Sequence, residues 1–440
     1  MSKIKDYIVH FFKGTDKLLA LLCMITSALG VVMVYSATRY SLSGAGGLTR
    51  DARTMIIAIV IGLTAAMVIS FVDYDIICRV WYVWAVLGVG LMILVQLIGV
   101  APDARADART WINLGIFYFQ PSELVKIFFI ITFSVHLNYV RDEINKLKNV
   151  VLLMLHALVP FGLVAISGDD GSALVFMIIA ISLLFVAGIN WKYILGAIAL
   201  VAAAIPLLWF KMSEFQKQRF IVIVNPDRYP NTAYQQKLGL NAMRNGGFLG
   251  SGLFRGTYTQ SGSIPEGEND MIFTVVGEEA GILGCIIVLL LIAAVLFRVI
   301  RDGNKAITGP AQYLCYGVAF MIAAQTLINV AMCLRLGPVI GITLPFISAG
   351  GSSTLGLYVG IGLVFSVYRS DFQQHQETNF RLIGIRSPFN ENIESSVSYN
   401  KKDAVKKQKA VKKAKQPIRT TARKSSAPRH SKTYTNTHGK

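Results

Sequence analysis

The sequence predicts an all-α polytopic membrane protein with about ten transmembrane helices. Its 440 residues are 53% hydrophobic, and the mean hydropathy of +0.52 excludes an ordinary soluble or disordered chain. Apolar runs of about 20 residues recur through roughly the first 370 positions, and a helix needs this length to cross a bilayer. Only helices and closed barrels satisfy the backbone in lipid, and the residue alternation of barrel strands is absent. The runs are therefore expected to be helices.

The apolar runs can be placed in order along the chain. Lys3, Lys5, Lys13 and Lys17 precede the first run and no small-residue cleavage site follows, so we expect an uncleaved first helix. With approximate ends, the expected spans are Leu18–Ala37, Met55–Phe71, Val80–Val100, Pro121–Leu137, Val150–Ile166, Ala173–Gly188, Trp191–Phe210, Phe273–Arg298, Ala311–Cys333 and Ser353–Tyr368.

The short loops predict the orientation. Basic residues concentrate in the loops that share a side with the N-terminus, as the positive-inside rule requires for cytoplasmic loops. These residues are Arg141, Lys146, Lys148, Lys192, Arg298, Arg301 and Lys305. Both termini are therefore expected in the cytoplasm, and residues from about 211 to 272 form one long external loop.

The C-terminal part differs sharply in composition. Residues 401–440 contain 14 Lys and Arg and one acidic residue, Asp403, so they carry 13 of the 18 net positive charges. Such a segment cannot bury enough apolar surface to fold. We expect a transmembrane domain over residues 1–370 and a basic, disordered cytoplasmic tail over 371–440. On a membrane protein such a tail favours the anionic leaflet over nucleic acid as its partner.

Cysteine and histidine usage indicates neither disulfides nor a metal site. The five cysteines lie in or beside apolar runs without CxxC spacing, and the six histidines are scattered. A metal site built from His or Cys is therefore not expected.

The external loop carries the most unusual chemistry. Glu266, Glu268 and Asp270 follow one another among glycines, and the chain re-enters an apolar run at Phe273. A carboxylate at a membrane boundary near several cationic groups suits chemistry on an anionic, lipid-borne substrate. On composition alone, a solvated loop between two helices is an equal alternative.

Charged residues also occur inside one expected span. Pro121 suits the first turn of a helix, and Glu123 and Lys126, three residues apart, share one helix face. Charges within a span are costly and usually face a polar cavity, so a functional pair is favoured over a structural ion pair.

Three further segments are rich in glycine and small polar residues. Ser167–Ser172 predicts a tight external turn, in which Asp170 or Ser172 caps the next helix or contributes to a site. Gly246–Gly256 lacks the spacing of a nucleotide-binding loop, but with Arg255 it could offer backbone N–H groups to a pyrophosphate. Thr343–Ser353 predicts an irregular or re-entrant segment, with Ser352 or Ser353 as a candidate cap.

A series of short motifs, each weak alone, occurs in order along the membrane part. They are Trp111-Ile112-x-Leu114-Gly115, Phe119-Gln120-Pro121-Ser122-Glu123-x-x-Lys126, Asp169-x-Gly171-Ser172, Asn225-Pro226 followed by Tyr234-Gln235, Pro265-Glu266 before Asp270-x-Ile272-Phe273, Gly277-Glu278-Glu279-x-Gly281, and Leu344-Pro345-Phe346-x-Ser348-x-Gly350-Gly351-Ser352-Ser353. Together, from about Val34 to Arg369, they resemble the SEDS family (shape, elongation, division and sporulation) of RodA, FtsW and SpoVE.

The chain departs from the family pattern near two of these motifs. Glu268-Asn269 stands where the family usually has His-Thr, and Met271 stands where it usually has Phe. Ser167-Gly168 replaces a common Gln-Pro before Asp169, and Ala349 replaces a usual Tyr. The aspartate that the family requires is present as Asp270, so activity is expected with an altered local environment.

The resemblance implies a peptidoglycan glycosyltransferase. Such an enzyme polymerises lipid II at the outer face of the bacterial cytoplasmic membrane, with inversion and with undecaprenyl pyrophosphate as leaving group. Asp270 would be the general base on the acceptor hydroxyl. Arg244, Arg255 and Lys126 would offset charge on the pyrophosphate, and Glu123 would orient Lys126. Further substrate contacts are expected from Trp111, Glu266, Asp169 and Ser352.

The resemblance also implies partners. A single-span class B penicillin-binding protein would supply the transpeptidase, and membrane lipids would surround the spans. A divalent cation, Mg²⁺ or Mn²⁺, could bridge the diphosphate, although no motif requires one. Whether the chain acts in elongation, division or sporulation is left open by these residues.

A lipid II flippase is the alternative function. Glu123 and Lys126 within a span could equally form a translocation relay. However, the carboxylate most tied to the motifs lies in an external loop, and no clear inverted repeat is present. A purely structural division scaffold would not explain the charge of that loop. The polymerase is favoured.

Overall fold

The structure is a computed structural model that describes residues 14–42, 47–101, 108–115 and 118–382. Its elements are α2 (Lys17–Thr38), η1 (Arg39–Leu42), α3 (Arg50–Ser70), α4 (Tyr74–Arg79), α5 (Trp81–Ile98), β1 (Ile112–Asn113), β2 (Tyr118–Phe119), α6 (Pro121–Tyr139), η2 (Arg141–Glu143), α7 (Leu147–Ile166), α8 (Asp170–Val186), α9 (Trp191–Lys211), α10 (Glu214–Val224), α11 (Pro230–Gly246), α12 (Thr257–Gln260), α13 (Ile272–Glu279), α14 (Gly281–Lys305), α15 (Gly309–Cys333) and α16 (Gly351–Leu382).

The predicted all-α membrane fold is confirmed. Within the described residues, seven helices are long and apolar enough to cross a membrane: α2 with η1, α3, α5, α7, α14, α15 and α16 up to Ser370. Shorter apolar helices lie at α8 and the first part of α9, and α6 coincides with the remaining expected span. The number of helices that cross the membrane, and their topology, stay predictions.

Local signals in the sequence explain where several helices begin. Asp16 Oδ1 accepts hydrogen bonds from Leu18 N (3.0 Å) and Leu19 N (3.2 Å), so it caps α2. Thr49 and Thr308 cap α3 and α15 in the same way, and Pro121 occupies the first turn of α6. Each cap satisfies N–H groups that would otherwise lack a partner at the start of the helix.

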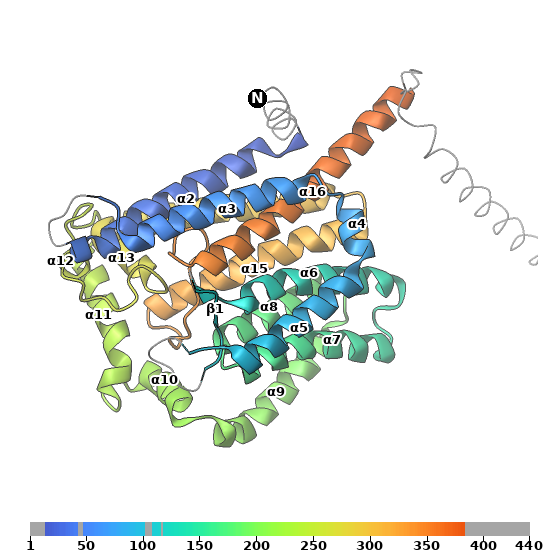
Figure 1. Cartoon of the computed structure of the whole chain (residues 1–440). Helices are drawn as coiled ribbons and strands as arrows, with labels where there is room; N and C mark the ends of the chain where they lie inside the picture. The colour runs from blue at the N-terminus through green and yellow to red at the C-terminus, as the bar shows by residue number, and fades with distance from the viewer. Residues whose placement is uncertain (1–13, 43–46, 102–107, 116–117, 383–440) are drawn as a thin grey trace, which may run out of the picture. The chain divides into compact units, whose positions relative to one another are not determined.

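The helices form a bundle with α15 and α16 in its interior. Of the spanning segments, these two are the most buried, at 61% and 72%, whereas only 17% of the α5 segment is buried. Figure 1 shows α2 and α3 on one side of this pair and α5 and α7 on the other. Small residues permit close packing: a Cβ on Gly317 would lie 2.5 Å from Ile130 Cγ2.

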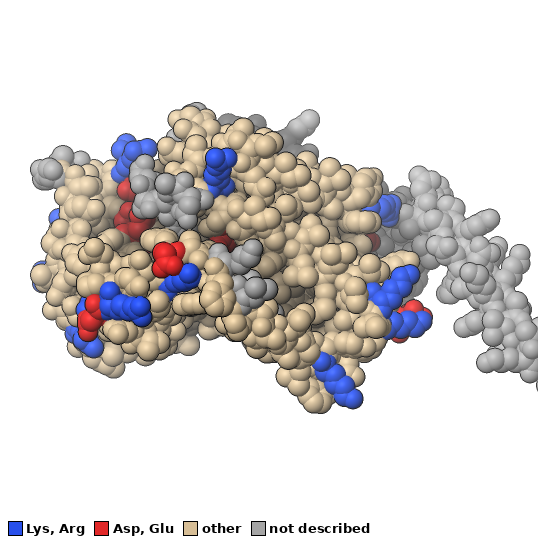
Figure 2. Space-filling model, turned by 90° about the horizontal axis from the view of Figure 1, so that it is seen from below, with Lys and Arg blue, Asp and Glu red and all other residues tan. Residues whose placement is uncertain are grey.

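The surface is that of a membrane protein. Leu97, Phe185 and Phe210 each expose 72% or more of their surface. Figure 2 shows a broad belt without charged side chains between two ends where Lys, Arg, Asp and Glu gather. Since charges are costly in hydrocarbon, this distribution agrees with a bundle that crosses the bilayer.

One expectation about the chain near residue 270 is wrong. The expected single span Phe273–Arg298 is two helices, α13 and α14, which meet at Gly281 with φ +67°. A Cβ on Gly281 would lie 2.4 Å from Gly250 N, so only glycine permits this close crossing of the main chain. The expected external loop from about 211 to 272 contains the helices α10, α11 and α12, and its place outside the membrane stays a prediction.

The C-terminal boundary was expected at residue 370. The structure continues α16 to Leu382. The remainder of the expected tail, residues 383–440, lies outside the described residues. The division into a domain and a tail stays a prediction.

Candidate active site

A polar cavity of about 680 Å³ lies where several distant segments of the chain meet. It is lined by Thr110, Trp111, Gln120, Asp169, Phe215, Arg219, Val222, Asn231, Thr232, Gln235, Glu266, Asn269, Asp270, Val339, Ile340, Gly341, Thr343, Ala349, Gly350, Gly351 and Ser353. The structure thereby brings together four residues predicted from the sequence: Trp111, Asp169, Glu266 and Asp270.

Asp270 is held in the cavity wall by contacts of its own loop. Its side chain is only 7% exposed. Asn329 Nδ2 donates to both Asp270 O and Ile342 O, each at 2.7 Å, and so ties the loop to α15 and to the segment before α16. Ser348 Oγ donates to Asn269 O at 2.7 Å. These contacts immobilise the main chain on either side of the carboxylate, which is the preorganisation that a catalytic group requires.

Glu266 is a second carboxylate of the same loop. Its φ of +53° is unusual for a residue other than glycine, and Met271 N donates to its carbonyl at 3.0 Å. Asn269 Nδ2 donates to Glu266 Oε2 at 2.7 Å. The departure Asn269 therefore orients Glu266, a role for which the sequence offered no signal.

Glu268, another departure from the family pattern, has different surroundings. It is absent from the cavity lining, and Ala349 N donates to its carbonyl at 2.9 Å. Burial raises the pKa of the Glu268 carboxyl above its ordinary value, and the carboxylates of Glu266 and Asp51 raise it further. Glu268 thus adds negative charge beside the cavity without lining it.

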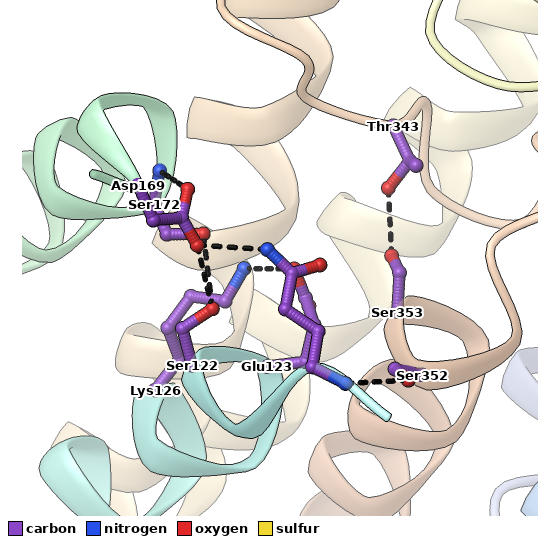
Figure 3. A network of polar contacts seen from close by, with 9 residues as sticks. Ser122, Glu123, Lys126, Asp169, Ser172, Thr343, Ser352 and Ser353 are labelled. Atoms are coloured by element: carbon purple, nitrogen blue, oxygen red, sulfur yellow. Dashed lines mark hydrogen bonds and ion pairs between the residues drawn. The ribbon is translucent and has the colours of Figure 1, made fainter. Parts of the chain in front are cut away.

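Asp169 organises another part of the cavity lining. Its Oδ2 accepts from Gln120 Nε2 (2.7 Å) and Ser122 Oγ (2.8 Å), and its Oδ1 accepts from Ser172 N (3.1 Å). Figure 3 shows this carboxylate between the start of α6 and the start of α8. Asp169 is therefore the cap of α8, and the expectation that Asp170 or Ser172 caps it is wrong.

Glu123 and Lys126 lie one turn further along α6. Lys126 Nζ donates to Glu123 Oε1 at 2.8 Å, and the two side chains are 0% and 7% exposed. A Cβ on Gly356 of α16 would lie 2.9 Å from Glu123 O, so this pair is enclosed where α16 crosses α6. Neither residue lines the cavity. The pair lies beside the cavity, next to residues that line it.

The side chain of Ser352 holds the main chain just before α6. Its Oγ accepts from Gln120 N at 3.0 Å, and its neighbour Ser353 shares a hydrogen bond of 2.7 Å with Thr343 Oγ1. Both contacts appear in Figure 3. Ser353, rather than the predicted Ser352, lines the cavity. Because α16 begins here, the positive end of its helix dipole borders the cavity.

Arg244 and Arg255 lie away from this cavity. Both are exposed, and neither is among the lining residues. The glycine-rich segment that contains Arg255 packs on the α13–α14 junction, where Ser251 N donates to Glu278 O (2.9 Å) and Gly252 N to Glu279 O (3.0 Å). These N–H groups are therefore occupied by the protein itself, contrary to the expectation that they are offered to a pyrophosphate.

Arg219 was missed in the sequence. It lines the cavity from α10, a helix in the segment that was expected to be a loop. Its signal was present: Ser213 and Gln216 form a capping box at the start of α10, and Phe215, Arg219 and Val222 follow at helical spacing.

The cavity shows no preformed metal site. Among the residues that the structure describes, no three His, Cys, Asp or Glu side chains gather closely enough to hold a metal ion. The divalent cation that could bridge the diphosphate stays a prediction.

Comparison with known proteins agrees with this architecture. The family model for cell cycle proteins of the FtsW, RodA and SpoVE type matches residues 16–373. Peptidoglycan glycosyltransferase MrdB of Escherichia coli (strain K12) is 32% identical over 313 residues, which are 70% of this chain and 83% of that protein. The probable peptidoglycan glycosyltransferase FtsW of Geobacter sulfurreducens is 31% identical over 365 residues, 80% of this chain and 94% of that protein.

Solved structures show the same fold. A chain of a peptidoglycan synthase complex, described as coordinating polymerization and crosslinking, superposes with a TM-score of 0.70 at 26% identity over 82% of this chain and 99% of that chain. The rod shape determining protein RodA of Thermus thermophilus has a TM-score of 0.60 at 24% identity, over 82% and 98%. The resemblance that the motifs predict is confirmed: the chain belongs to the FtsW, RodA and SpoVE (SEDS) family of cell cycle proteins.

Proposed function

We propose that the chain is a peptidoglycan glycosyltransferase that polymerises lipid II into glycan strands at the outer face of the bacterial cytoplasmic membrane. The observation that carries the proposal is the position of Asp270, which an immobilised loop holds in the wall of a polar cavity of about 680 Å³. The glycosyltransferase names of the relatives support the reaction class.

Asp270 acts as the general base. It takes the proton of the acceptor sugar hydroxyl while that oxygen forms a bond to the anomeric carbon of the donor. The bond from this carbon to the diphosphate breaks, and its electron pair leaves with undecaprenyl pyrophosphate. Attack opposite the leaving group inverts the anomeric centre.

The remaining polar residues position the sugars. Gln120 and Asp169 form one wall, and Glu266 and Asn269 form another, so hydroxyl and amide groups can be bound between them. Trp111 adds an aromatic face, which suits the apolar face of a sugar ring. Donors and acceptors fixed in place around the sugars reduce the entropy lost on the way to reaction.

The buried pair Glu123 and Lys126 lies next to Ser122, which donates to Asp169, and so supports the part of the wall that Asp169 forms. Lys126 is held by Glu123 and shielded from solvent, so we assign it a role in the electrostatics of the Asp169 region rather than direct contact with substrate. Arg244 and Arg255, exposed and outside the lining, are proposed to act on the lipid substrate only as it approaches.

The partner follows from the likeness to a peptidoglycan synthase complex. That complex is described as coordinating polymerization and crosslinking. We propose that this chain likewise pairs with a class B penicillin-binding transpeptidase, with its spans surrounded by membrane lipids.

The function is tested by incubating the purified chain with purified lipid II, alone and with its cognate transpeptidase, and separating the products by gel electrophoresis. Glycan strands of many disaccharides are expected. Transport of lipid II across a vesicle membrane without any polymer would overturn the proposal in favour of the flippase.

A further inference from the structure

The helices α10 and α11 form one part of the cavity wall. Phe215, Arg219 and Val222 of α10 recur at i, i+4 and i+7, so one face of this helix lines the cavity. From α11, Asn231, Thr232 and Gln235 add an amide and hydroxyl surface beside it. The part of the wall from α10 is apolar apart from one cation, and the part from α11 is polar and uncharged.

The charges that line the cavity are unequal. Among the described lining residues, Arg219 is the one cation, and the same lining contains three carboxylates, those of Asp169, Glu266 and Asp270. A diphosphate that enters this cavity is repelled by the carboxylates. Besides the start of α16, whose helix dipole borders the cavity, Arg219 is the lining group that attracts it by a full positive charge.

Neighbouring cations are engaged elsewhere. Lys217 Nζ pairs with Glu214 Oε1 and Lys237 Nζ pairs with Asp227 Oδ1, each at 2.9 Å. No salt bridge of the described residues involves Arg219. Of the cations on α10 and α11, Arg219 is thus the one directed to the cavity without a carboxylate at ion-pair distance.

The guanidinium of Arg219 is also held in place. Its Cζ lies 4.4 Å from the centre of the Phe215 ring. Stacking on an aromatic face restrains the guanidinium while its N–H donors, which lie in the plane of the group, stay directed outward. An arginine in this arrangement is suited to bind phosphate oxygens with two parallel hydrogen bonds.

We propose that Arg219 binds the diphosphate of the lipid-linked donor sugar and stabilises the charge that develops on it as it leaves. This inference rests on the proposed function, since it names the leaving-group site of the same reaction. The acceptor oxygen forms its bond to the anomeric carbon, Asp270 takes the proton, and the electron pair of the broken bond passes to the diphosphate oxygen beside Arg219. The base and the leaving-group site thereby belong to different elements, the 266–270 loop and α10.

The experiment compares Arg219→Gln with Arg228→Gln. Arg228 is a matched control because it is an exposed arginine in the same region, with its Cζ 5.6 Å from the centre of the Tyr229 ring, and it is absent from the cavity lining. With purified lipid II, Arg219→Gln is expected to lower kcat by about 10²–10³-fold, the usual cost of one donor to a developing anion. Arg228→Gln should retain the wild-type kcat, and Arg219→Lys should restore part of the loss.

Binding of the product is measured in parallel, with undecaprenyl diphosphate as the probe and undecaprenol as its uncharged counterpart. Arg219→Gln should weaken binding of the diphosphate and leave binding of the alcohol unchanged, with a melting temperature equal to that of the wild type. If Arg219→Gln raises KM and leaves kcat unchanged, the arginine binds the lipid diphosphate without stabilising it as it leaves, and the inference is wrong.

The two proposals fail in different ways. A wild-type chain that forms no glycan strands contradicts the proposed function, and the binding comparison still tests Arg219 by itself. A wild-type chain that polymerises lipid II, with Arg219→Gln equal to Arg228→Gln in kcat and in diphosphate binding, contradicts the inference alone.

Discussion

Two carboxylates eight positions apart, Asp270 and Glu278, have opposite surroundings. Both are buried, at 7% and 0% exposure, and both belong to motifs that carry the family resemblance. The oxygens of Glu278 accept from Tyr258 N (2.8 Å), Thr259 N (2.8 Å), Thr259 Oγ1 (2.7 Å) and Asn245 Nδ2 (3.2 Å). Asp270 instead borders the cavity, and its loop is held mainly through main-chain carbonyls.

The difference separates two uses of a buried acid. Glu278 accepts hydrogen bonds from N–H groups at the start of α12 and so joins α12 to α13. Its negative charge is therefore stabilised by contacts within the fold. Its neighbour Glu279 acts similarly, accepting from Ser36 Oγ of α2 at 2.6 Å. Burial and membership of a motif therefore do not identify a catalytic acid. Asp270 is proposed as the base because it lines the cavity, on a loop that other atoms stabilise.

The largest expected effect is that of Asp270→Asn on catalysis. The amide keeps the shape of the side chain but cannot accept the proton, so the rate of lipid II polymerisation should fall by about 10²–10⁴-fold. The melting temperature in detergent should change little. Glu268→Gln, which removes a carboxylate two positions away and outside the cavity lining, is the control. An unchanged polymerisation rate in Asp270→Asn would falsify the assignment of the base.

A comparable effect, but on stability, is expected for Lys126→Met. The substitution leaves Glu123 buried without its cation, which typically costs about 3–5 kcal/mol. The measurement is the melting temperature in detergent. The double variant Glu123→Gln with Lys126→Met should recover most of the loss, because no unpaired charge remains. A single variant as stable as the wild type would show that the pair contributes nothing to folding.

Glu278→Gln should have a smaller effect, on stability and not on catalysis. The amide replaces one acceptor oxygen by a donor that faces the N–H groups of α12, so a loss of about 1.5–3 kcal/mol in stability is expected. The folded fraction should polymerise lipid II at the wild-type kcat. Loss of kcat at an unchanged melting temperature would break the comparison, since Glu278 would then act in catalysis.

The smallest effect concerns Glu268 and pH. Its carboxyl has a pKa above the ordinary value of about 4.3, because of burial and of the Glu266 and Asp51 carboxylates. The folded state therefore holds the Glu268 proton more tightly than the unfolded state, and stability falls as the pH rises from the ordinary pKa through the raised one. Glu268→Gln should remove this slope and slightly raise the melting temperature at neutral pH. Melting curves across mildly acidic to neutral pH test this; an unchanged slope contradicts it.

Much of the protein could be predicted from local sequence. The apolar runs predict the helices because a span requires a minimum length of apolar residues, and Pro121 marks a helix start through its fixed φ. The motifs identified the family and selected Asp270, Asp169, Glu266 and Trp111, all of which line one cavity. These properties depend on residues that are close together along the chain, or on the chemical identity of single residues.

The partners of those residues were decided only by the tertiary structure. Asp169 meets Gln120 across 49 positions, Asp270 meets Asn329 across 59, and Gln120 meets Ser352 across 232. Such contacts depend on how helices cross, which no local pattern specifies. For the same reason the choice among arginines could not be made from the sequence. Arg219, Arg244 and Arg255 have the same chemistry, and only the packing of α10 against the cavity directs Arg219 into it while the other two lie outside its lining.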